Sequence, residues 1–145
     1  METLSYSMAP TNWAICFQHD CPMAERCLRH AVALLAPAGL TQHNTVLPSA
    51  REGDTCRLFA TCEPCLIARG MKSTLPRVYS EKITAIRKDL YKVFGSVPMF
   101  YRYRDGMYDI TPDQQRRIEA VFKKHGMKDA PKYDKTTLAY FFPSK

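Results

Sequence analysis

The sequence has no long hydrophobic run. Its longest apolar stretch lies between Ala31 and Leu40 and is interrupted by Pro37 and Gly39. A membrane-spanning helix needs roughly 20 apolar residues, so we expect no transmembrane segment. The first residues, METLSYSMAPTNW, also lack the basic and apolar segments of a secretory signal peptide. We therefore expect a cytoplasmic protein that does not bind a membrane.

Motifs that identify an enzyme are also absent. The sequence contains no nucleophile elbow, phosphate-binding loop, dinucleotide-binding fingerprint or paired carboxylates on one helix face. Asp20 and Glu25 are accounted for as residues that begin a helix. We expect a binding protein. The alternative is a thiol- or metal-dependent enzyme, in which His19 or His30 would act as a base beside a reactive cysteine.

Cysteine is too sparse for a fold built on disulfide bonds. The chain has six cysteines in 145 residues, about 4%, and a chain of this length can bury a core without covalent staples. Hydrophobic residues make up 46% and charged residues 24%, as in an ordinary globular domain. In a reducing compartment, clustered thiols indicate metal or redox chemistry.

Charge and cysteine divide the chain into two parts. Residues 1–75 carry six basic and six acidic side chains, whereas residues 76–145 carry 15 basic and 8 acidic ones and thus all of the net charge of +7. The cysteines all lie in the neutral part. We predict a cysteine-rich, metal-binding module over residues 1–55 and a basic α+β domain over residues 56–145. Excess positive charge favours an anionic partner, although lysines that only solvate helix faces are the commoner explanation.

The first predicted helix lies in the neutral part. Asp20 can cap a helix that begins near Pro22 and ends at Pro37. Apolar residues recur along it at helical spacing, so we expect them on its buried face. These residues are Ala24, Cys27, Leu28, Ala31, Leu34 and Leu35.

Two further helices are predicted in the basic part. One covers residues 80–94 and ends at Gly95, with one apolar stripe. The other begins at Thr111, where Thr111 and Gln114 form a capping box, and ends at Gly126.

A hairpin is predicted over residues 100–110. Asp105 and Gly106 are typical of a two-residue hairpin turn, and this turn would place Arg102 opposite Asp109. A closing strand over residues 136–142 and a first strand within residues 56–70 complete the pattern. The order strand, helix, strand, strand, helix, strand predicts an α+β fold with a small ferredoxin-like (split βαβ) antiparallel sheet and two helices. A winged-helix arrangement is the competing topology.

The cysteine spacing favours a metal site. Three cysteines follow the pattern C-x4-C-x5-C, and one more could join them from beyond the long loop. The four ligands predicted for a structural, tetrahedral zinc site are Cys16, Cys21, Cys27 and Cys56. The substitutes are His19, His30, Cys62 and Cys65. An iron–sulfur cluster is the alternative cofactor, and free buried cysteines or a disulfide are the alternatives without metal.

Three segments resemble a known family. They are CFQHDCPMAERCLRHA, the segment Cys56 to Phe59, and FYRYRDGMYDITPDQQRRIEAVFKKHG. Together they resemble a family of small, uncharacterised Bacteroidetes proteins classed as a domain of unknown function, over most of the chain from Cys16 to Gly126. The resemblance implies no activity. It implies that Cys16, Cys21, Cys27 and Cys56 are recurrent thiols and that Cys62 and Cys65 are additional ones.

The basic part is a candidate surface for nucleic acid. Phosphate groups could be neutralised by Arg102, Arg104, Arg116, Arg117, Lys123 and Lys124. Tyr101, Tyr103 or Phe100 could stack on unpaired bases, although the pairing of the hairpin favours a core position for Tyr103. The alternative is a protein-interaction scaffold that self-associates through the exposed edge of the closing strand.

Overall fold

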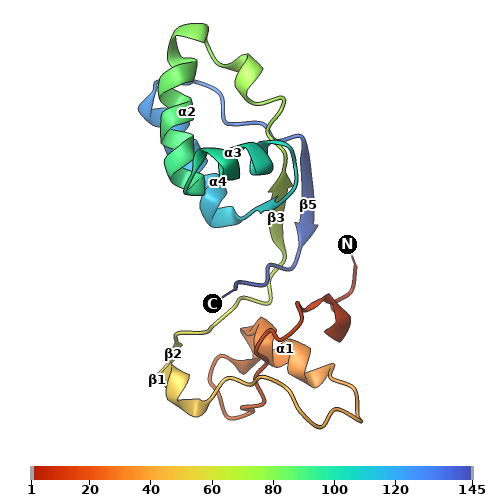
Figure 1. Ribbon diagram of the computed structural model, residues 1–145. Coiled ribbons are helices and arrows are strands. Elements are labelled where there is room, and N and C mark those ends of the chain that lie inside the picture. The colour runs from red at the N-terminus through yellow and green to blue at the C-terminus, as the bar shows by residue number, and fades with distance from the viewer. Residues whose placement is uncertain (1, 145) are drawn as a thin grey trace. The chain divides into compact units, whose positions relative to one another are not determined.

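The computed structural model describes residues 2–144 and has an α+β fold (Figure 1). Its helices are α1 (Leu28–Leu34), α2 (Ser80–Phe94), α3 (Val97–Arg104) and α4 (Pro112–Lys124). Its strands are β1 (Arg51–Glu52), β2 (Thr55–Cys56), β3 (Cys65–Arg69), β4 (Asp109–Ile110) and β5 (Lys135–Ala139). Within residues 2–144, no helix has the length and apolar character needed to cross a membrane.

The chain folds into two compact units. Unit 1 comprises Met1–Cys65 together with Ala139–Lys145, and unit 2 comprises Leu66–Leu138. Each unit has a hydrophobic core of its own. All six cysteines belong to unit 1, and unit 2 carries 16 basic and 8 acidic side chains.

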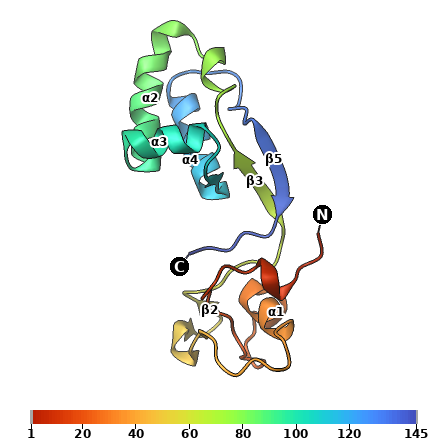
Figure 2. The same cartoon turned by 45° about the vertical axis from the view of Figure 1, so that its right-hand side comes forward.

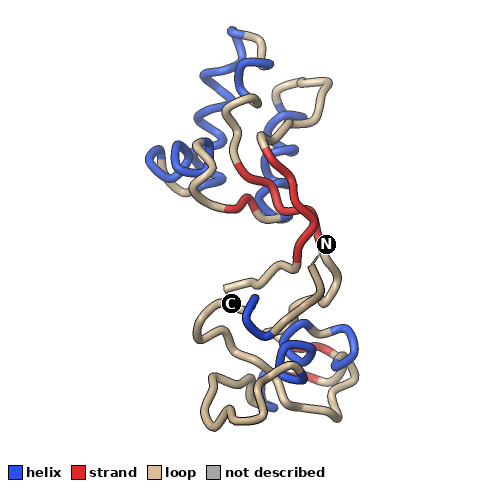
Figure 3. Tube along the Cα trace, turned by 90° about the vertical axis from the view of Figure 1, so that its right-hand side faces the viewer, coloured by secondary structure: helices blue, strands red, loops and turns tan. Residues whose placement is uncertain are grey.

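Unit 1 consists mostly of loops and turns around one short helix (Figure 3). Its core contains Trp13, Ile15 and Leu28, all buried. The Trp13 indole meets the ring of Phe142 edge-on at 5.0 Å and donates a 2.8 Å hydrogen bond to the carbonyl of Pro143. The last residues of the chain therefore complete the core that its first residues begin.

The start of the predicted first helix is wrong. Ala24–Arg26 is a single 3-10 turn, and Cys27 is extended, with φ −98° and ψ 119°. Cys27 forms an antiparallel bridge with Thr61, and the N–H of Leu28 donates to the carbonyl of Ala60 at 2.7 Å. The backbone groups of this segment are satisfied by a distant segment, so they do not form a helix.

The predicted buried face of this helix is wrong at its C-terminal end. Val32 and Ala33 are buried, whereas Leu34 and Leu35 are 63% and 46% exposed. α1 runs only from Leu28 to Leu34. A helix of this length is too short to place a second row of apolar side chains, Leu34 and Leu35, in the core.

α2 and α4 confirm the two other predicted helices. α2 buries Ile86, Leu90 and Phe94 on one face. α4 begins with the predicted capping box: the Thr111 hydroxyl accepts from the N–H of Gln114, whose side chain accepts from the N–H of Thr111. Local residues determine both helices.

The predicted hairpin is wrong, because its first strand is the helix α3. Ser96 caps the first turn of Val97–Arg104 with its hydroxyl. Gly106, with φ +80°, ends the helix, and the N–H groups of Gly106 and Met107 donate to carbonyls of the last turn. These hydrogen bonds form a Schellman motif, which requires a residue in the left-handed region. A two-residue hairpin turn has the same requirement. Asp105 and Gly106 therefore end a helix here.

Three strands form the sheet of unit 2, in the order β4-β3-β5, and β3 and β5 lie side by side (Figure 2). β4 is antiparallel to β3, with Ala68 opposite Ile110 and Arg69 opposite Asp109. Arg69 and Asp109 form an ion pair at 2.6 Å. The partner of Asp109 is thus Arg69, and the predicted pairing with Arg102 is wrong.

The ferredoxin-like arrangement is not confirmed. It requires four strands in one sheet, and in unit 2 the segment expected to supply one of them is α3. β3 and β5 do fall where a first and a closing strand are predicted, and β5 lies at an edge of the sheet. The predicted α+β class is confirmed, but the sheet of unit 2 has three strands and not the predicted four.

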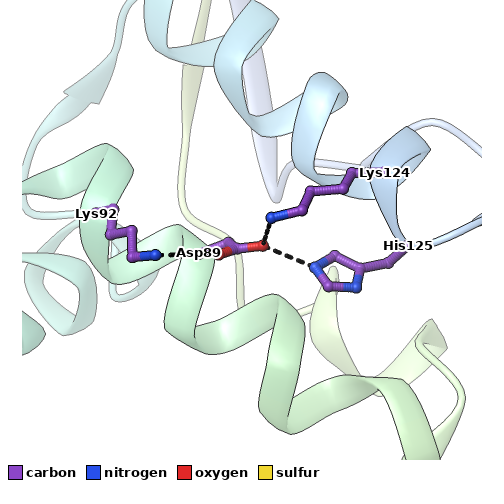
Figure 4. A network of polar contacts seen from close by, with 4 residues as sticks. All are labelled: Asp89, Lys92, Lys124 and His125. Atoms are coloured by element: carbon purple, nitrogen blue, oxygen red, sulfur yellow. Dashed lines mark hydrogen bonds and ion pairs between the residues drawn. The ribbon is translucent and has the colours of Figure 1, made fainter.

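Asp89 links α2 to the C-terminal end of α4 (Figure 4). Its carboxylate accepts from His125 Nε2 at 2.8 Å and from Lys124 Nζ at 3.1 Å, and Lys92 Nζ lies 3.7 Å away. Cationic groups are favourable at a helix C-terminus. The hydrogen bonds from His125 and then Lys124 lower the pKa of Asp89 from 3.8 to about 2.

We expect Asp89→Asn to destabilise unit 2 in a pH-dependent manner. Because the pKa of Asp89 is lowered in the folded state, its stabilisation is complete above about pH 4 and is lost as the pH falls through about 2. Urea unfolding followed by circular dichroism should therefore separate variant from wild type at neutral pH and bring them together in acid. Asp129→Asn, in an exposed loop, is the control. A difference that stays constant over this pH range would contradict the ionic role.

Candidate metal centre

The four predicted cysteine ligands come from separate backbone segments of unit 1. The N–H of Cys16 donates to the carbonyl of Arg29, and that of Cys21 donates to the carbonyl of Gln18 in a tight turn. Cys27 lies in the bridge that precedes α1. Cys56 lies on β2, which pairs with β1. Each cysteine is held by backbone hydrogen bonds that do not depend on the sulfur atoms.

These segments bring the four cysteines around one cavity. Its volume is about 20 Å³, enough for about one occupant the size of a water molecule. Cys16, Cys21, Cys27 and Cys56 all line it. Much of the rest of the lining is apolar and consists of Met23, Ala24, Val46, Leu47, Leu58 and Phe59. Of the predicted substitutes, His30 lines this cavity, whereas His19, Cys62 and Cys65 are not among its lining residues.

The cysteines are free thiols, and in residues 2–144 their sulfur atoms are not arranged as ligands around one ion. All six are unpaired. Among residues 2–144, no three Cys, His, Asp or Glu side chains have the arrangement of ligands around one ion. A cysteine sulfur moves by rotation about a single bond. Ligation would therefore require the sulfur atoms to turn inward from backbone positions that already surround the cavity.

The thiols are close enough to affect one another. Burial is the largest cause that raises the pKa of the Cys16 thiol, a backbone hydrogen bond at Gln18 lowers it, and Cys27, Cys21 and Cys56 raise it further. The three neighbours act by charge repulsion. A cation close to these thiols would favour their ionised form.

Arg29 supplies a fixed cation beside the cavity. It is 3% exposed, and it lines the cavity. Its guanidinium donates to the carbonyls of Leu58 at 2.7 Å and Ala14 at 2.6 Å and lies 4.2 Å from the centre of the Trp13 ring. Burial lowers the pKa of Arg29, and the nearby thiols, Cys27 first, raise it.

Arg29 has no carboxylate partner within the described part of the chain. A buried charge normally requires a partner of opposite sign. The groups able to carry negative charge that act on the pKa of Arg29 are the thiols of Cys27, Cys56 and Cys16. The position of Arg29 thus favours thiolates at this site.

Arg51 provides a second cation on the cavity wall. Its Nη2 lies 3.4 Å from the Asp20 carboxylate. Hydrogen bonding to the Cys21 side chain is the largest cause that raises the pKa of Arg51. Its Nη1 is buried and has no hydrogen-bond partner among residues 2–144, so a thiolate on this side of the cavity would satisfy it.

His30 supports Cys16 through its backbone. Its Nδ1 lies 3.0 Å from the carbonyl oxygen of Cys16, and its ring meets the edge of the His19 ring at 5.1 Å. When Nδ1 donates to this carbonyl, the tautomer is set and the ring is oriented. His30 is therefore placed to hold the backbone of Cys16, a predicted metal ligand, in position.

Three of the six predicted nucleic-acid residues form ion pairs. Arg104 pairs with Asp105, Arg116 with Asp113 and Lys124 with Asp89. Arg102, Arg117 and Lys123 are exposed and take part in no ion pair within residues 2–144. Half of the predicted cations are therefore already neutralised by neighbouring carboxylates.

Of the proposed base-stacking residues, one is buried in the core of unit 2 and two are partly buried against it. Phe100 is fully buried. Tyr103 stacks on Phe94 with ring centres 4.5 Å apart, and Tyr101 lies against Phe100 and beneath the Arg104 guanidinium. Phe100 cannot stack on a base, because α3 turns it into the core.

Sequence reasoning missed Arg29 and Arg51. In the sequence they are two of the six basic side chains of residues 1–75. Their only signal in the sequence is proximity: Arg29 follows Cys27 by two residues and precedes His30 directly. Which surface charge becomes a buried one depends on tertiary packing.

A family model matches residues 1–142. The chain belongs to DUF6078, a family of unknown function. The resemblance to an uncharacterised family that the sequence indicates is thus confirmed. No curated protein and no solved structure matches the chain. The family assigns no activity, so the chemistry of the site has to carry the functional argument.

Proposed function

We propose that unit 1 is a cysteine-rich module that binds one zinc ion through Cys16, Cys21, Cys27 and Cys56. The observation that carries this proposal is that these four cysteines line one small cavity beside Arg29, a buried cation with no carboxylate partner among residues 2–144. Four protein thiolates fill a tetrahedral coordination sphere and leave no position for substrate, which is typical of a structural site. The ion would hold the loops of unit 1 together.

Charge balance supports four thiolates. A zinc ion with four thiolates carries two excess negative charges. Two arginines, Arg29 and Arg51, lie on the wall of the same cavity. Their charges would neutralise the site inside an apolar surround, where an unbalanced charge is costly. Thiolate ligation also needs reduced cysteines, and hence a reducing compartment such as the cytoplasm.

The cavity size favours a single ion over an iron–sulfur cluster. Both cofactors accept four thiolates. A volume of about 20 Å³ suits one ion, whereas a cluster adds several iron and sulfide atoms. Zinc is the first candidate because tetrahedral thiolate sites select it.

Metal content tests the proposal directly. Full-length protein prepared without added metal should contain about one zinc per chain by elemental analysis. Cys56→Ser should lose most of it, while Cys65→Ser, whose sulfur is not among the cavity-lining groups, should keep it. Iron and sulfide in place of zinc would indicate a cluster. Metal-free wild-type protein that also takes up no zinc would overturn the proposal.

A second candidate function is contact with nucleic acid through unit 2. It is favoured by the 16 basic against 8 acidic side chains of this unit. Of the six cations predicted to contact phosphates, Arg102, Arg117 and Lys123 are exposed and form no ion pair within residues 2–144, so they are available to phosphates. The other three predicted cations, Arg104, Arg116 and Lys124, would first have to break their ion pairs with carboxylates.

Salt dependence tests this second candidate. Binding of a single-stranded oligonucleotide should weaken steeply with salt, and each of Arg102→Gln, Arg117→Gln and Lys123→Gln should make the logarithmic slope shallower by about 0.7. Arg57→Gln, an exposed and paired arginine of unit 1, should leave the slope unchanged. Binding that is insensitive to salt would contradict phosphate contacts.

A further inference from the structure

A second cavity lies within unit 2 and is lined by basic and apolar side chains. It has a volume of about 250 Å³. Its cationic residues are Lys72, Arg87 and Arg104. Its apolar residues are Met71, Leu75, Pro76 and Ile83. The cations come from three segments: the loop after β3, the middle of α2 and the end of α3.

No carboxylate of residues 2–144 is among the groups that line this cavity, and two carboxylates lie next to its cations. Asp105 pairs with Arg104 through the Nε side and one terminal nitrogen, both at 2.9 Å, and this leaves Arg104 Nη1 available. Asp134 accepts from the backbone N–H groups of Lys72 and Ser73 and from the Ser73 hydroxyl. Both carboxylates are engaged, so neither neutralises the whole group of cations.

Arg87 is the least satisfied of the three cations. It forms no ion pair within residues 2–144, and its Nε is buried without a hydrogen-bond partner. An unsatisfied buried donor costs free energy unless a ligand or water accepts from it. Arg87 lines the cavity, and a guanidinium with terminal nitrogens free of ion pairs among residues 2–144 is suited to an oxyanion.

We propose that this cavity binds the phosphate group of a small organic phosphate of mononucleotide size. Lys72 and Arg87, with the remaining donor Nη1 of Arg104, match a doubly charged phosphate better than a single carboxylate, and arginine binds phosphate oxygens with paired donors. The apolar residues provide a surface for the organic part of the ligand, as in most small-molecule pockets. Unit 2 contains no cysteine, so this site does not depend on the proposed metal.

The phosphate could belong to a free nucleotide or to a nucleic-acid strand. A pocket that holds one phosphate and one ring should accept a mononucleotide. A charged outer surface would need several phosphates in a row, because each contact there adds little. The length of the ligand therefore distinguishes the two sources.

The test is a titration of the full-length protein, followed by nuclear magnetic resonance, with adenosine monophosphate, inorganic phosphate, adenosine and a single-stranded oligonucleotide at fixed ionic strength. We expect adenosine monophosphate to bind, inorganic phosphate to compete with it, and adenosine to bind at least tenfold more weakly. Arg87→Gln should weaken adenosine monophosphate about tenfold or more, and Lys72→Gln, at an exposed position, should weaken it in the same direction. Lys88→Gln, the exposed neighbour on α2, should leave binding unchanged.

Any one of several results would overturn the proposal. They are the absence of binding by adenosine monophosphate, equal binding of adenosine, and equal loss in Lys88→Gln and Lys72→Gln. Binding of the oligonucleotide without the mononucleotide would also overturn it and would favour an extended nucleic-acid surface. The dispersion of the spectra shows for each variant whether unit 2 is folded.

Discussion

Cys27→Ser is expected to abolish metal binding and to unfold unit 1 while unit 2 stays folded. Removing one of four thiolates from a structural zinc site removes binding energy that is also folding energy, of the order of 10 kcal/mol in zinc-dependent modules. This is comparable to the entire stability of a domain. Unit 1 has one short helix, α1, and few other regular elements, so it has little to replace the loss.

Two spectroscopic signals separate the units in this experiment. The single tryptophan, Trp13, is buried in the core of unit 1, so its fluorescence reports on that unit. The longer helices, α2, α3 and α4, all lie in unit 2 and dominate the circular dichroism. We expect Cys27→Ser to lose the emission of a buried tryptophan and to keep most of the helical signal.

Cys65→Ser is the matched control, since it removes a thiol of unit 1 that is not a proposed ligand. A strong chelator added to the wild type should reproduce the effect of Cys27→Ser without any change in sequence. If both cysteine variants unfold alike, or if the chelator has no effect on a metal-loaded sample, the metal does not hold unit 1 together.

Arg29→Met is expected to destabilise unit 1 by about 2–6 kcal/mol, because it leaves two buried acceptors without their donors. The substitution leaves the carbonyls of Leu58 and Ala14 without their donors, and each unsatisfied buried group costs about 1–3 kcal/mol. It also removes the fixed cation beside the thiols. Urea unfolding followed by Trp13 fluorescence measures the effect, and Arg57→Met, exposed in the same unit, should cost little.

The same substitution should raise the pH at which metal is released. A nearby cation favours the thiolate form and lowers the pKa of a thiol, so its removal raises the thiol pKa values and protons displace the metal earlier during acidification. Arg29→Lys keeps the charge and should retain the wild-type release pH while losing part of the stability. Release at an unchanged pH in Arg29→Met would show that Arg29 acts through packing alone.

The elements that could be predicted are those with local signals at both ends. α4 has its capping box at Thr111 and Gln114 and its left-handed glycine at Gly126, and α2 has its apolar stripe and Gly95. In both helices the residues that determine the structure are neighbours in the chain. Local preference and tertiary packing agree there, which is why these predictions are confirmed.

A local signal leads to a wrong prediction where two different structures require the same residue. A glycine in the left-handed region suits a hairpin turn and a helix C-terminus equally. The deciding residue for α3 lies at the other end, where Ser96 caps the helix. The missed feature was thus a start signal ten residues before Gly106.

The sequence by itself determined the α+β class, two of the helices, the concentration of cysteine in one part and of positive charge in the other, and four thiols to consider together. Only the tertiary structure placed the four cysteines around one cavity and buried Arg29 beside them. It also placed Lys72, Arg87 and Arg104 around a second cavity. The reason is the range of the interactions. Capping and helical periodicity act over a few residues, whereas a charge is buried or exposed according to segments, such as Ala60 and Thr61 against Cys27, that meet only when the chain has folded.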